Sequence, residues 1–309
     1  MKRRLFILFA LLALIANALQ TRAQNIGKET SSESLIVSTS WLAQHLNDPG
    51  LVLLQIGEKD EYLASHIPRA QFITLSEIST PRGEGLTLEL PPVEQLKAAF
   101  ERVGVTDNSR IVLYFSKDWV TPTARVFLTL DYLGLGQKTS ILDGGLIAWK
   151  GEGRPVTNEI IAAKSGKITS RPRKEIIVDA SWVNANSNKA GAKILDARLP
   201  KFYSGAEAGR MPRAGHIPNA KNIPFSTLVD DTNKLKSVAA LRQLFEEAGV
   251  QKGDSVTAYC HVGQTASLLY FVARYLGYDA HLYDGSFEDW SRRPELLVEK
   301  TDPPNTKPD

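Results

Sequence analysis

Short apolar segments alternate with amphipathic ones along most of the 309-residue chain. Residues 96–103 and 241–248 carry apolar side chains at helical spacing, and each segment is followed by a glycine, Gly104 or Gly249, as is typical of a helix that ends in a left-handed turn. Short strands are predicted at residues 51–54, 72–73, 111–115, 193–196, 222–223 and 256–260. Alternation of apolar strands with helices is typical of a parallel sheet. The pattern therefore predicts an α/β fold, with helices covering both faces of a mainly parallel sheet.

The same series of landmarks occurs twice in the chain, in the same order. The pairs are Trp41 with Trp182, His66-Ile67-Pro68 with His216-Ile217-Pro218, the two helices that end at Gly104 and Gly249, Tyr132 with Tyr275, Asp143-Gly144 with Asp284-Gly285, and Trp149 with Trp290. Similarity that keeps its order over such a length indicates a duplicated domain. Because the histidines and tryptophans recur in both copies, we expect them to be structural.

The duplication divides the chain into two domains, at residues 35–155 and 176–299. Residues 156–175 between them are mostly polar and are typical of a linker. Residues 300–309 contain three prolines and little apolar surface, so we expect a loose tail. The chain is long enough for two cores. That size matters because its single cysteine cannot form an internal disulfide.

The N-terminus combines a basic start with the only long apolar run. Three basic residues precede residues 5–19, which are apolar except for Asn17, and Ala23 follows shortly afterwards. This order is typical of a secretory signal peptide, and the run is shorter than the roughly 20 residues that span a bilayer. We therefore expect residues 1–23 to be a cleaved signal peptide and the protein to be exported, periplasmic or secreted, without a membrane anchor.

Removal of that peptide changes the charge balance. The chain has 37 basic and 34 acidic residues, and four basic residues but no acidic ones lie in residues 1–23. The remainder has 33 basic against 34 acidic residues, a net charge of −1. A nearly neutral chain has no general attraction for nucleic acids or anionic membranes. We expect neither as a partner.

Cys260 stands where chemistry is expected in such a fold. It ends a predicted strand, and residues 264–274 have the pattern of a helix. Ligands of open parallel sheets bind at the carboxyl ends of the strands, and a helix N-terminus presents free N–H groups and a positive dipole end. Both favour the nucleophilic thiolate. Gly263 permits a tight loop, and Thr265 can add a hydroxyl donor. The position indicates a reactive cysteine.

The chain resembles the rhodanese family. The motifs that carry the resemblance are the Cys-x-x-Gly-x-Thr-Ala loop from Cys260 to Ala266, Asp196-Ala197-Arg198, Gly215-His216-Ile217-Pro218, and Tyr283-Asp284-Gly285 with Trp290. The resemblance covers both repeats and implies two tandem rhodanese-like domains, the first inactive and the second active, with the site in the cleft between them. It further implies that Cys260 takes sulfur from a small donor as a persulfide and passes it to a thiophilic acceptor such as cyanide. No metal or organic cofactor is implied.

The first repeat has lost the residues of this chemistry. Phe115 stands where the second repeat has Cys260, and the loop that follows Phe115 is two residues longer. Gln55 and Gly57 replace the Asp and Arg of the second repeat's Asp-Ala-Arg motif. The first domain therefore keeps the scaffold alone.

An anionic donor requires hydrogen-bond donors and cations near Cys260. The candidates for substrate binding are His261, Val262, Gly263, Gln264, Thr265, Ala266, Arg198 and Arg210. Arg210 lies with Arg213 in a nine-residue insertion found only in the second repeat, and guanidinium groups suit anions, although Arg210 could also be a solvated surface residue. Arg198 could contact the donor or pair with Asp196. His261 could supply a charge near neutral pH or be a simple loop residue.

Two other functions compete with sulfur transfer by an enzyme. Protein phosphatases also use a cysteine loop before a helix, but their loop ends in an arginine, whereas Ala266 stands here and the next arginine is Arg274. A non-enzymatic sulfur carrier is the other alternative. Among donors we favour thiosulfate over 3-mercaptopyruvate, because an exported protein meets a cytosolic keto acid less readily.

Overall fold

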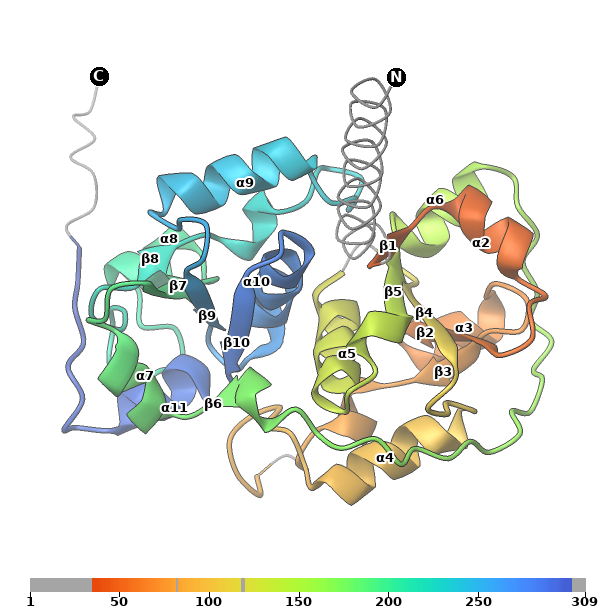
Figure 1. Ribbon diagram of the computed structural model, residues 1–309, viewed down its shortest axis with the longest axis horizontal. Coiled ribbons are helices and arrows are strands. Elements are labelled where there is room, and N and C mark those ends of the chain that lie inside the picture. The colour runs from red at the N-terminus through yellow and green to blue at the C-terminus, as the bar shows by residue number, and fades with distance from the viewer. Residues whose placement is uncertain (1–34, 82, 118–119, 302–309) are drawn as a thin grey trace, which may run out of the picture.

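The computed structural model describes residues 35–81, 83–117 and 120–301, which form two similar α/β units (Figure 1). Each unit contains a five-stranded sheet, in the order β1-β5-β4-β2-β3 in the first and β6-β10-β9-β7-β8 in the second. All strand pairs within both sheets are parallel. The predicted α/β class, with two tandem domains of mainly parallel sheet, is confirmed.

The first unit contains the strands predicted at residues 51–54, 72–73 and 111–115 and the helix predicted at residues 96–103. Its strands are β1 (Ile36–Val37), β2 (Leu51–Ile56), β3 (Gln71–Ile73), β4 (Arg110–Phe115) and β5 (Thr139–Leu142). Its α-helices are α2 (Thr39–His45), α3 (Lys59–Ala64), α4 (Val93–Arg102), α5 (Val120–Tyr132) and α6 (Gly145–Gly151), with the 3₁₀ turns η1 (Leu75–Ile78) and η2 (Gly136–Lys138).

The second unit repeats this series. Its strands are β6 (Ile177–Val178), β7 (Ala192–Asp196), β8 (Lys221–Asn222), β9 (Ser255–Tyr259) and β10 (Asp279–Tyr283). Its α-helices are α7 (Ala180–Asn186), α8 (Pro200–Ser204), α9 (Val238–Glu247), α10 (Gln264–Tyr275) and α11 (Ser286–Arg292), with the 3₁₀ turns η3 (Lys174–Ile176) and η4 (Phe225–Thr227).

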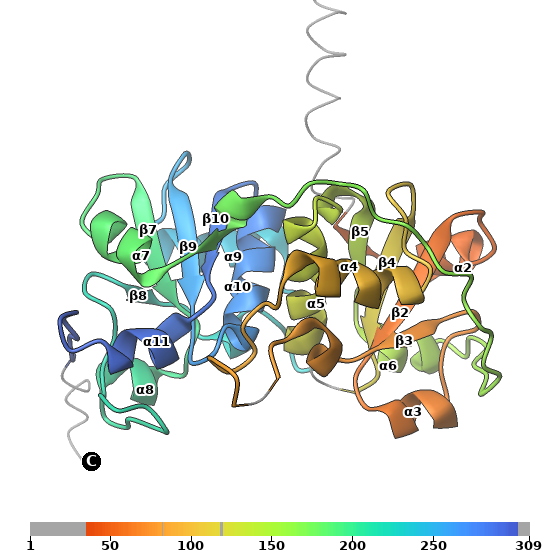
Figure 2. The same ribbon diagram turned by 90° about the horizontal axis from the view of Figure 1, so that it is seen from below.

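The two units pack against each other through equivalent helices, α5 and α10. Figures 1 and 2 show these helices facing one another between the two sheets. Phe127 of α5 meets Phe271 of α10 edge to face, with ring centroids 4.7 Å apart. Asp131 of α5 is buried and accepts hydrogen bonds from Tyr270 Oη at 2.7 Å and from Arg274 Nε at 2.9 Å. The cores of both units merge into one apolar cluster across this interface.

The segment between the units is held against the first unit. After α6 it continues without regular structure as far as η3 and follows α4 (Figure 2). The Gly166 N–H donates to the Glu101 carbonyl at 2.8 Å, the Ile168 N–H to the Glu101 carboxylate at 2.7 Å, and the Ser170 hydroxyl to the Leu133 carbonyl at 2.6 Å. Its backbone is therefore a fixed strap rather than a free spacer.

The repeated tryptophans and histidines serve the two units in the same way. Trp149 and Trp290 are buried, and each indole N–H donates at 2.8 Å to a carbonyl beyond its helix. His66 stacks on Tyr62 with centroids 4.1 Å apart, and His216 stacks on Tyr203 at 4.0 Å. These residues are part of the framework, as their recurrence indicates.

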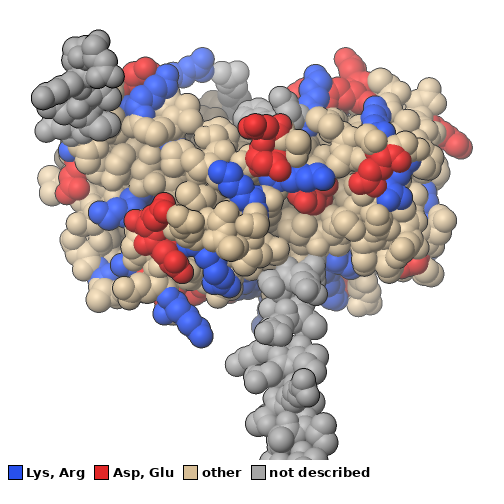
Figure 3. Space-filling model, turned by 90° about the horizontal axis from the view of Figure 1, so that it is seen from above, with Lys and Arg blue, Asp and Glu red and all other residues tan. Residues whose placement is uncertain are grey.

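The predicted signal peptide and residues 302–309 of the predicted tail lie outside the described residues. Within the described ranges, no helix combines the length and apolar character needed to cross a bilayer. Basic and acidic side chains are interspersed on the face shown in Figure 3.

Candidate active site

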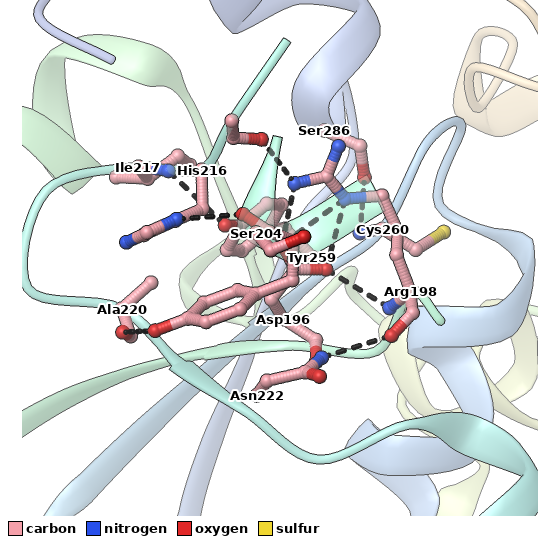
Figure 4. Close-up of polar contacts among 12 residues, drawn as sticks. Asp196, Arg198, Ser204, His216, Ile217, Ala220, Asn222, Tyr259, Cys260 and Ser286 are labelled. Atoms are coloured by element: carbon pink, nitrogen blue, oxygen red, sulfur yellow. Dashed lines mark hydrogen bonds and ion pairs between the residues drawn. The ribbon is translucent and has the colours of Figure 1, made fainter. Parts of the chain in front are cut away.

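Cys260 follows β9 directly, at the carboxyl end of the second sheet, and the next helix, α10, begins four residues later. Its side chain is buried, with 1 % of its surface exposed. In Figure 4 the sulfur points away from the neighbouring pair of Asp196 and Arg198. The cysteine therefore occupies the strand-to-helix position that the sequence predicts.

The carbonyl groups of the cysteine loop are held by the turn and helix beside it. The Phe287 N–H donates to the Cys260 carbonyl at 3.0 Å, and the Glu288 N–H donates to the His261 carbonyl at 2.9 Å. The Ser286 hydroxyl oxygen accepts the Cys260 N–H at 3.2 Å (Figure 4). The Ser267 hydroxyl donates to the Gly263 carbonyl at 2.7 Å. The loop is fixed through its carbonyl oxygens.

The N–H groups of the loop remain available to a ligand. Among the described residues, none accepts a hydrogen bond from the N–H groups of His261, Val262 and Gly263. The first N–H groups of α10, beginning at Gln264, lack acceptors within the helix by the geometry of an α-helix. Successive free N–H groups with the positive end of a helix dipole form an anion-binding cradle. The cradle would stabilise a thiolate or a persulfide anion on Cys260.

Gly263 makes the sharp turn into α10 possible. Its φ of 81° lies in the left-handed region, where side chains are strained. A Cβ at this position would also lie 3.1 Å from a guanidinium nitrogen of Arg125 and 3.2 Å from the Asp284 carbonyl oxygen. The residue is therefore fixed by both conformation and space.

Arg198 is committed to an ion pair. Its Nε lies 3.0 Å from both carboxylate oxygens of Asp196, and Nη2 lies 2.6 Å from Oδ2 and 2.7 Å from the Gly215 carbonyl (Figure 4). Its guanidinium carbon is 4.0 Å from the centre of the Phe287 ring. Of the two roles that the sequence left open, the structural pairing is present. The residue also lies close enough to Cys260 for their charges to interact.

His261 does not supply a charge at neutral pH. Burial lowers the pKa of His261 to about 4, and the positive charge of Arg198 acts in the same direction. Its ring meets Phe202 edge to face, with centroids 4.7 Å apart. Of the two roles that the sequence left open for His261, the lowered pKa favours the uncharged loop residue. A neutral imidazole can still donate one hydrogen bond.

The loop borders a cleft of about 860 Å³ between the two units. The second unit lines the cleft with loop residues His261, Val262 and Gln264, with Phe202, with residues 209–212 of the insertion, and with Glu288 and Arg292. The first unit contributes Ser76, Ser79, Thr80, Pro81, Gly83, Thr87 and Leu88. A cleft between the two domains is therefore present beside the cysteine loop, and its use as the active site stays a prediction.

The two arginines of the insertion have different environments. Arg210 lines the cleft, is exposed, and has no partner for its guanidinium among the described residues. Arg213 donates to the carbonyls of Trp290, Ser291, Arg293 and Leu296 at 2.7–2.9 Å. Arg213 thus holds the end of α11 and is not a spare donor-binding cation, contrary to the expectation that both arginines suit the donor.

The remaining predicted residues lie at the start of α10. The Gln264 side-chain amide is 3.5 Å from the Thr121 hydroxyl of α5, across the domain interface. The Thr265 hydroxyl has no partner among the described residues, and Ala266 is buried. The sequence pattern does not single out Arg125 or Glu288, although Arg125 is a visible charge within the apolar run of α5. It marks Asp284 only as a landmark of the repeat and the family motif. No group of three His, Cys, Asp or Glu side chains in the described part of the chain could hold a metal ion.

In domain one the equivalent position has no cysteine but the same framework. Tyr114 precedes Phe115 and accepts the Ile67 N–H on its hydroxyl at 3.1 Å, as Tyr259 accepts the Ile217 N–H at 3.1 Å. The chain therefore has two α/β domains with parallel sheets, and one of them places a cysteine at a strand end beside free N–H groups. This combination is typical of two-domain proteins that carry out chemistry on a thiol.

The chain belongs to the family of the rhodanese-like domain, whose model matches residues 38–152 and 179–293. It is 31% identical to the sulfur carrier protein TtuD of Thermus thermophilus, over 83% of this chain and 93% of that protein. It is 28% identical to a thiosulfate sulfurtransferase of Azotobacter vinelandii, over 87% and 98% of the two chains. It is also 28% identical to the 3-mercaptopyruvate sulfurtransferase of Escherichia coli, over 87% and 99%.

Solved structures share the fold at low sequence identity. EanB in complex with ergothioneine superposes with a TM-score of 0.80 at 19% identity, covering 88% of this chain and 71% of EanB. The anaerobic ergothioneine biosynthesis enzyme from Chlorobium limicola gives a TM-score of 0.79 at 20% identity, covering 87% and 71%. These likenesses concern the fold alone.

Proposed function

We propose that this protein is a sulfurtransferase that carries sulfur as a persulfide on Cys260, with thiosulfate as the donor. The observation that carries the proposal is the buried Cys260 beside the free N–H groups of residues 261–263, next to a cleft between the domains. The names of its relatives, thiosulfate sulfurtransferase and 3-mercaptopyruvate sulfurtransferase, support the same type of reaction.

The reaction has two balanced steps. The Cys260 thiolate attacks the outer sulfur of thiosulfate, the S–S bond of the donor breaks, and sulfite leaves with the bonding electron pair. The product is a persulfide on Cys260. Cyanide then attacks the outer sulfur, thiocyanate leaves, and the thiolate is regenerated without an external oxidant or reductant. Dividing one transfer into two displacements is the usual advantage of covalent catalysis.

The loop serves both steps through its backbone. Negative charge rests on the thiolate before the first step and on the persulfide after it. The free N–H groups of residues 261–263 and the start of α10 can hold that charge without rearrangement, because the loop carbonyls are already fixed by α11 and Ser267. His261, being neutral, can add a hydrogen bond but no charge.

Two alternatives differ in donor or in turnover. A 3-mercaptopyruvate donor would use the same cysteine, and a relative carries that name. A sulfur carrier would load the cysteine without rapid release to a small acceptor, as the name of TtuD suggests for that protein. Steady-state assays with cyanide and each donor separate all three: thiosulfate turnover supports the proposal, and turnover with 3-mercaptopyruvate alone, or loading without turnover, contradicts it.

We expect Arg210→Ala to lower kcat/KM for thiosulfate by roughly ten- to a hundredfold, the loss typical of one charge-assisted contact. Arg210 lines the cleft, and its guanidinium has no protein partner among the described residues that would occupy it instead. Cyanide's attack on preformed persulfide should change less, because the enzyme is then already loaded. Steady-state and single-turnover kinetics measure the two steps.

Arg171→Ala is the matched control for that change. Arg171 is an exposed arginine in the strap between the units and does not line the cleft. Its removal should leave both steps unchanged. A kcat/KM for Arg210→Ala within about twofold of wild type would identify Arg210 as ordinary surface.

We further propose that the protein is exported, on the basis of the basic start and the apolar run in residues 5–19. N-terminal sequencing of protein isolated from its native host should begin near Gln24. Cytoplasmic protein that retains Met1 would contradict the proposal.

A further inference from the structure

Arg125 is a fully buried arginine of α5, in the domain that lacks the cysteine. One nitrogen, Nη2, donates to the Leu88 carbonyl at 2.6 Å and lies 2.6 Å from Oδ1 of Asp284 in the other domain. The two remaining nitrogens, Nε and Nη1, are buried and have no hydrogen-bond partner in the described part of the chain. Burial of a guanidinium whose N–H groups lack acceptors lowers the stability of the fold unless neighbouring groups pair with its charge.

The free nitrogen Nη1 lies against the cysteine loop. A Cβ on Gly263 would be 3.1 Å from it, and 3.2 Å from the Asp284 carboxylate oxygen Oδ1. Gly263 is the residue at which the loop from Cys260 turns into α10. The ion pair thus lies against the cysteine loop at Gly263.

The Asp284 carboxylate extends this contact to the wall of the cleft. Its second oxygen, Oδ2, accepts the Leu90 N–H at 2.9 Å. Leu88, whose carbonyl Arg125 binds, lines the cleft and has a φ of 61°, an uncommon value for leucine. Arg125 and Asp284 together join the cysteine loop to residues 88–90 of the first domain.

We propose that Arg125 and Asp284 form an interdomain positioning pair, through which the first domain holds the cysteine loop in place and balances the charge felt by Cys260. The inference deepens the proposed function, because the loop matters through the sulfur that it holds. Arg125 touches no substrate in this proposal. It acts through the loop.

The charges around Cys260 make the pair testable. Arg198 carries a charge close to Cys260 and is neutralised by Asp196, while His261 is uncharged at neutral pH. On α11, which packs on the loop, the Glu288 carboxylate is paired with Arg292 at 2.6 Å. The Arg125–Asp284 pair is likewise balanced, so removal of one member leaves the other charge alone beside the loop. An unpaired Asp284 disfavours the thiolate, and an unpaired Arg125 favours it. The two single variants should therefore shift thiolate formation in opposite directions.

The measurement is the rate at which iodoacetamide alkylates Cys260, recorded as a function of pH in the full chain. For Arg125→Gln the midpoint of the profile should rise by roughly 1.5 pH units, and for Asp284→Asn it should fall by roughly 1.5 units, the size expected for one charge at about 8 Å in an effective dielectric of about 20. The double variant should return to within about 0.3 of a unit of wild type. Arg125→Lys, which keeps the charge, should leave the midpoint within about 0.3 of a unit of wild type. If the glutamine variant does not fold, the fall expected for Asp284→Asn alone tests the proposal.

Asp131→Asn is the matched control. It breaks the ion pairs that buried Asp131 of α5 makes with Arg274 of α10 and with Arg173. Arg274 lies 11 residues along α10 from Gly263, or about 16 Å. This variant should lower thermal stability without moving the midpoint. Shifts of the same sign in both single variants, shifts below about 0.2 of a unit, or an equal shift in Asp131→Asn would reduce the pair to interdomain packing. Alkylation does not require sulfur transfer, so failure of the proposed function appears separately, as wild-type protein that gains no sulfur from thiosulfate.

Discussion

The Cys260→Ser variant should transfer sulfur from thiosulfate to cyanide at a rate at least about a thousandfold below that of wild type. A serine hydroxyl remains protonated and cannot form a persulfide, so both steps of the reaction are lost, and removal of a nucleophile commonly costs several orders of magnitude. Intact-mass measurement after incubation with thiosulfate should show about one added sulfur atom, roughly 32 Da, on wild type and none on Cys260→Ser. Cyanide should remove the added mass.

The control for this change places a thiol at the equivalent position of the other domain. Phe115 follows Tyr114 in β4 as Cys260 follows Tyr259 in β9. In the double variant Cys260→Ser/Phe115→Cys, the new thiol lies in the first domain and is not followed by the loop from His261 to Gly263. Activity should therefore stay at the level of Cys260→Ser. Transfer by Cys260→Ser at the wild-type rate would refute the assignment of the sulfur carrier.

The second large effect is on stability. Asp196→Ala should lower the free energy of unfolding by about 3–5 kcal/mol, because Arg198 would remain buried without its partner. Asp196 and Arg198 are at most 2 % exposed, and the carboxylate also accepts the Arg198 N–H at 2.9 Å. Urea unfolding followed by fluorescence and circular dichroism measures the change.

Gln55→Ala is the matched comparison for Asp196→Ala. Gln55 occupies the corresponding place in β2, is equally buried, and accepts a hydrogen bond from the Tyr114 hydroxyl at 2.7 Å, but it has no ionic partner. Its loss should cost only about 1–3 kcal/mol, the range for an unsatisfied buried polar group. If Asp196→Ala costs no more than Gln55→Ala, the ion pair adds nothing to stability beyond a neutral hydrogen bond.

Most of the fold could be predicted because duplication makes each element visible twice. Residues 111–115 and 256–260 were recognisable as strands by their apolar runs, and they form β4 and most of β9. Cys260 could be located for the same reason, since the end of a parallel strand and the start of a helix can both be found from local pattern. These features depend on neighbours in sequence.

What could not be predicted depends on neighbours that are distant in the sequence. Arg213 and Arg210 stand three residues apart in a polar insertion, and nothing in that pattern shows that one binds four carbonyls while the other is exposed in the cleft. The neutrality of His261 arises from burial beside Phe202 and Arg198, which sequence periodicity does not encode. Arg125 is the same case, because its partner Asp284 is 159 positions away.

The two walls of the cleft come from different domains, so the reactive cysteine and the residues on the opposite wall belong to separate domains. The nucleophile and its N–H groups belong to the second domain, whereas Ser76, Ser79, Thr80 and Thr87 on the opposite wall belong to the first. Substitutions at Ser76, Ser79 and Thr80, which lie on that wall, can therefore reshape the cleft without replacing any residue of the loop around Cys260. The duplicated domain without a cysteine therefore contributes surface to the cleft, and changes on its wall can alter which molecules fit there while the residues of the Cys260 loop stay the same.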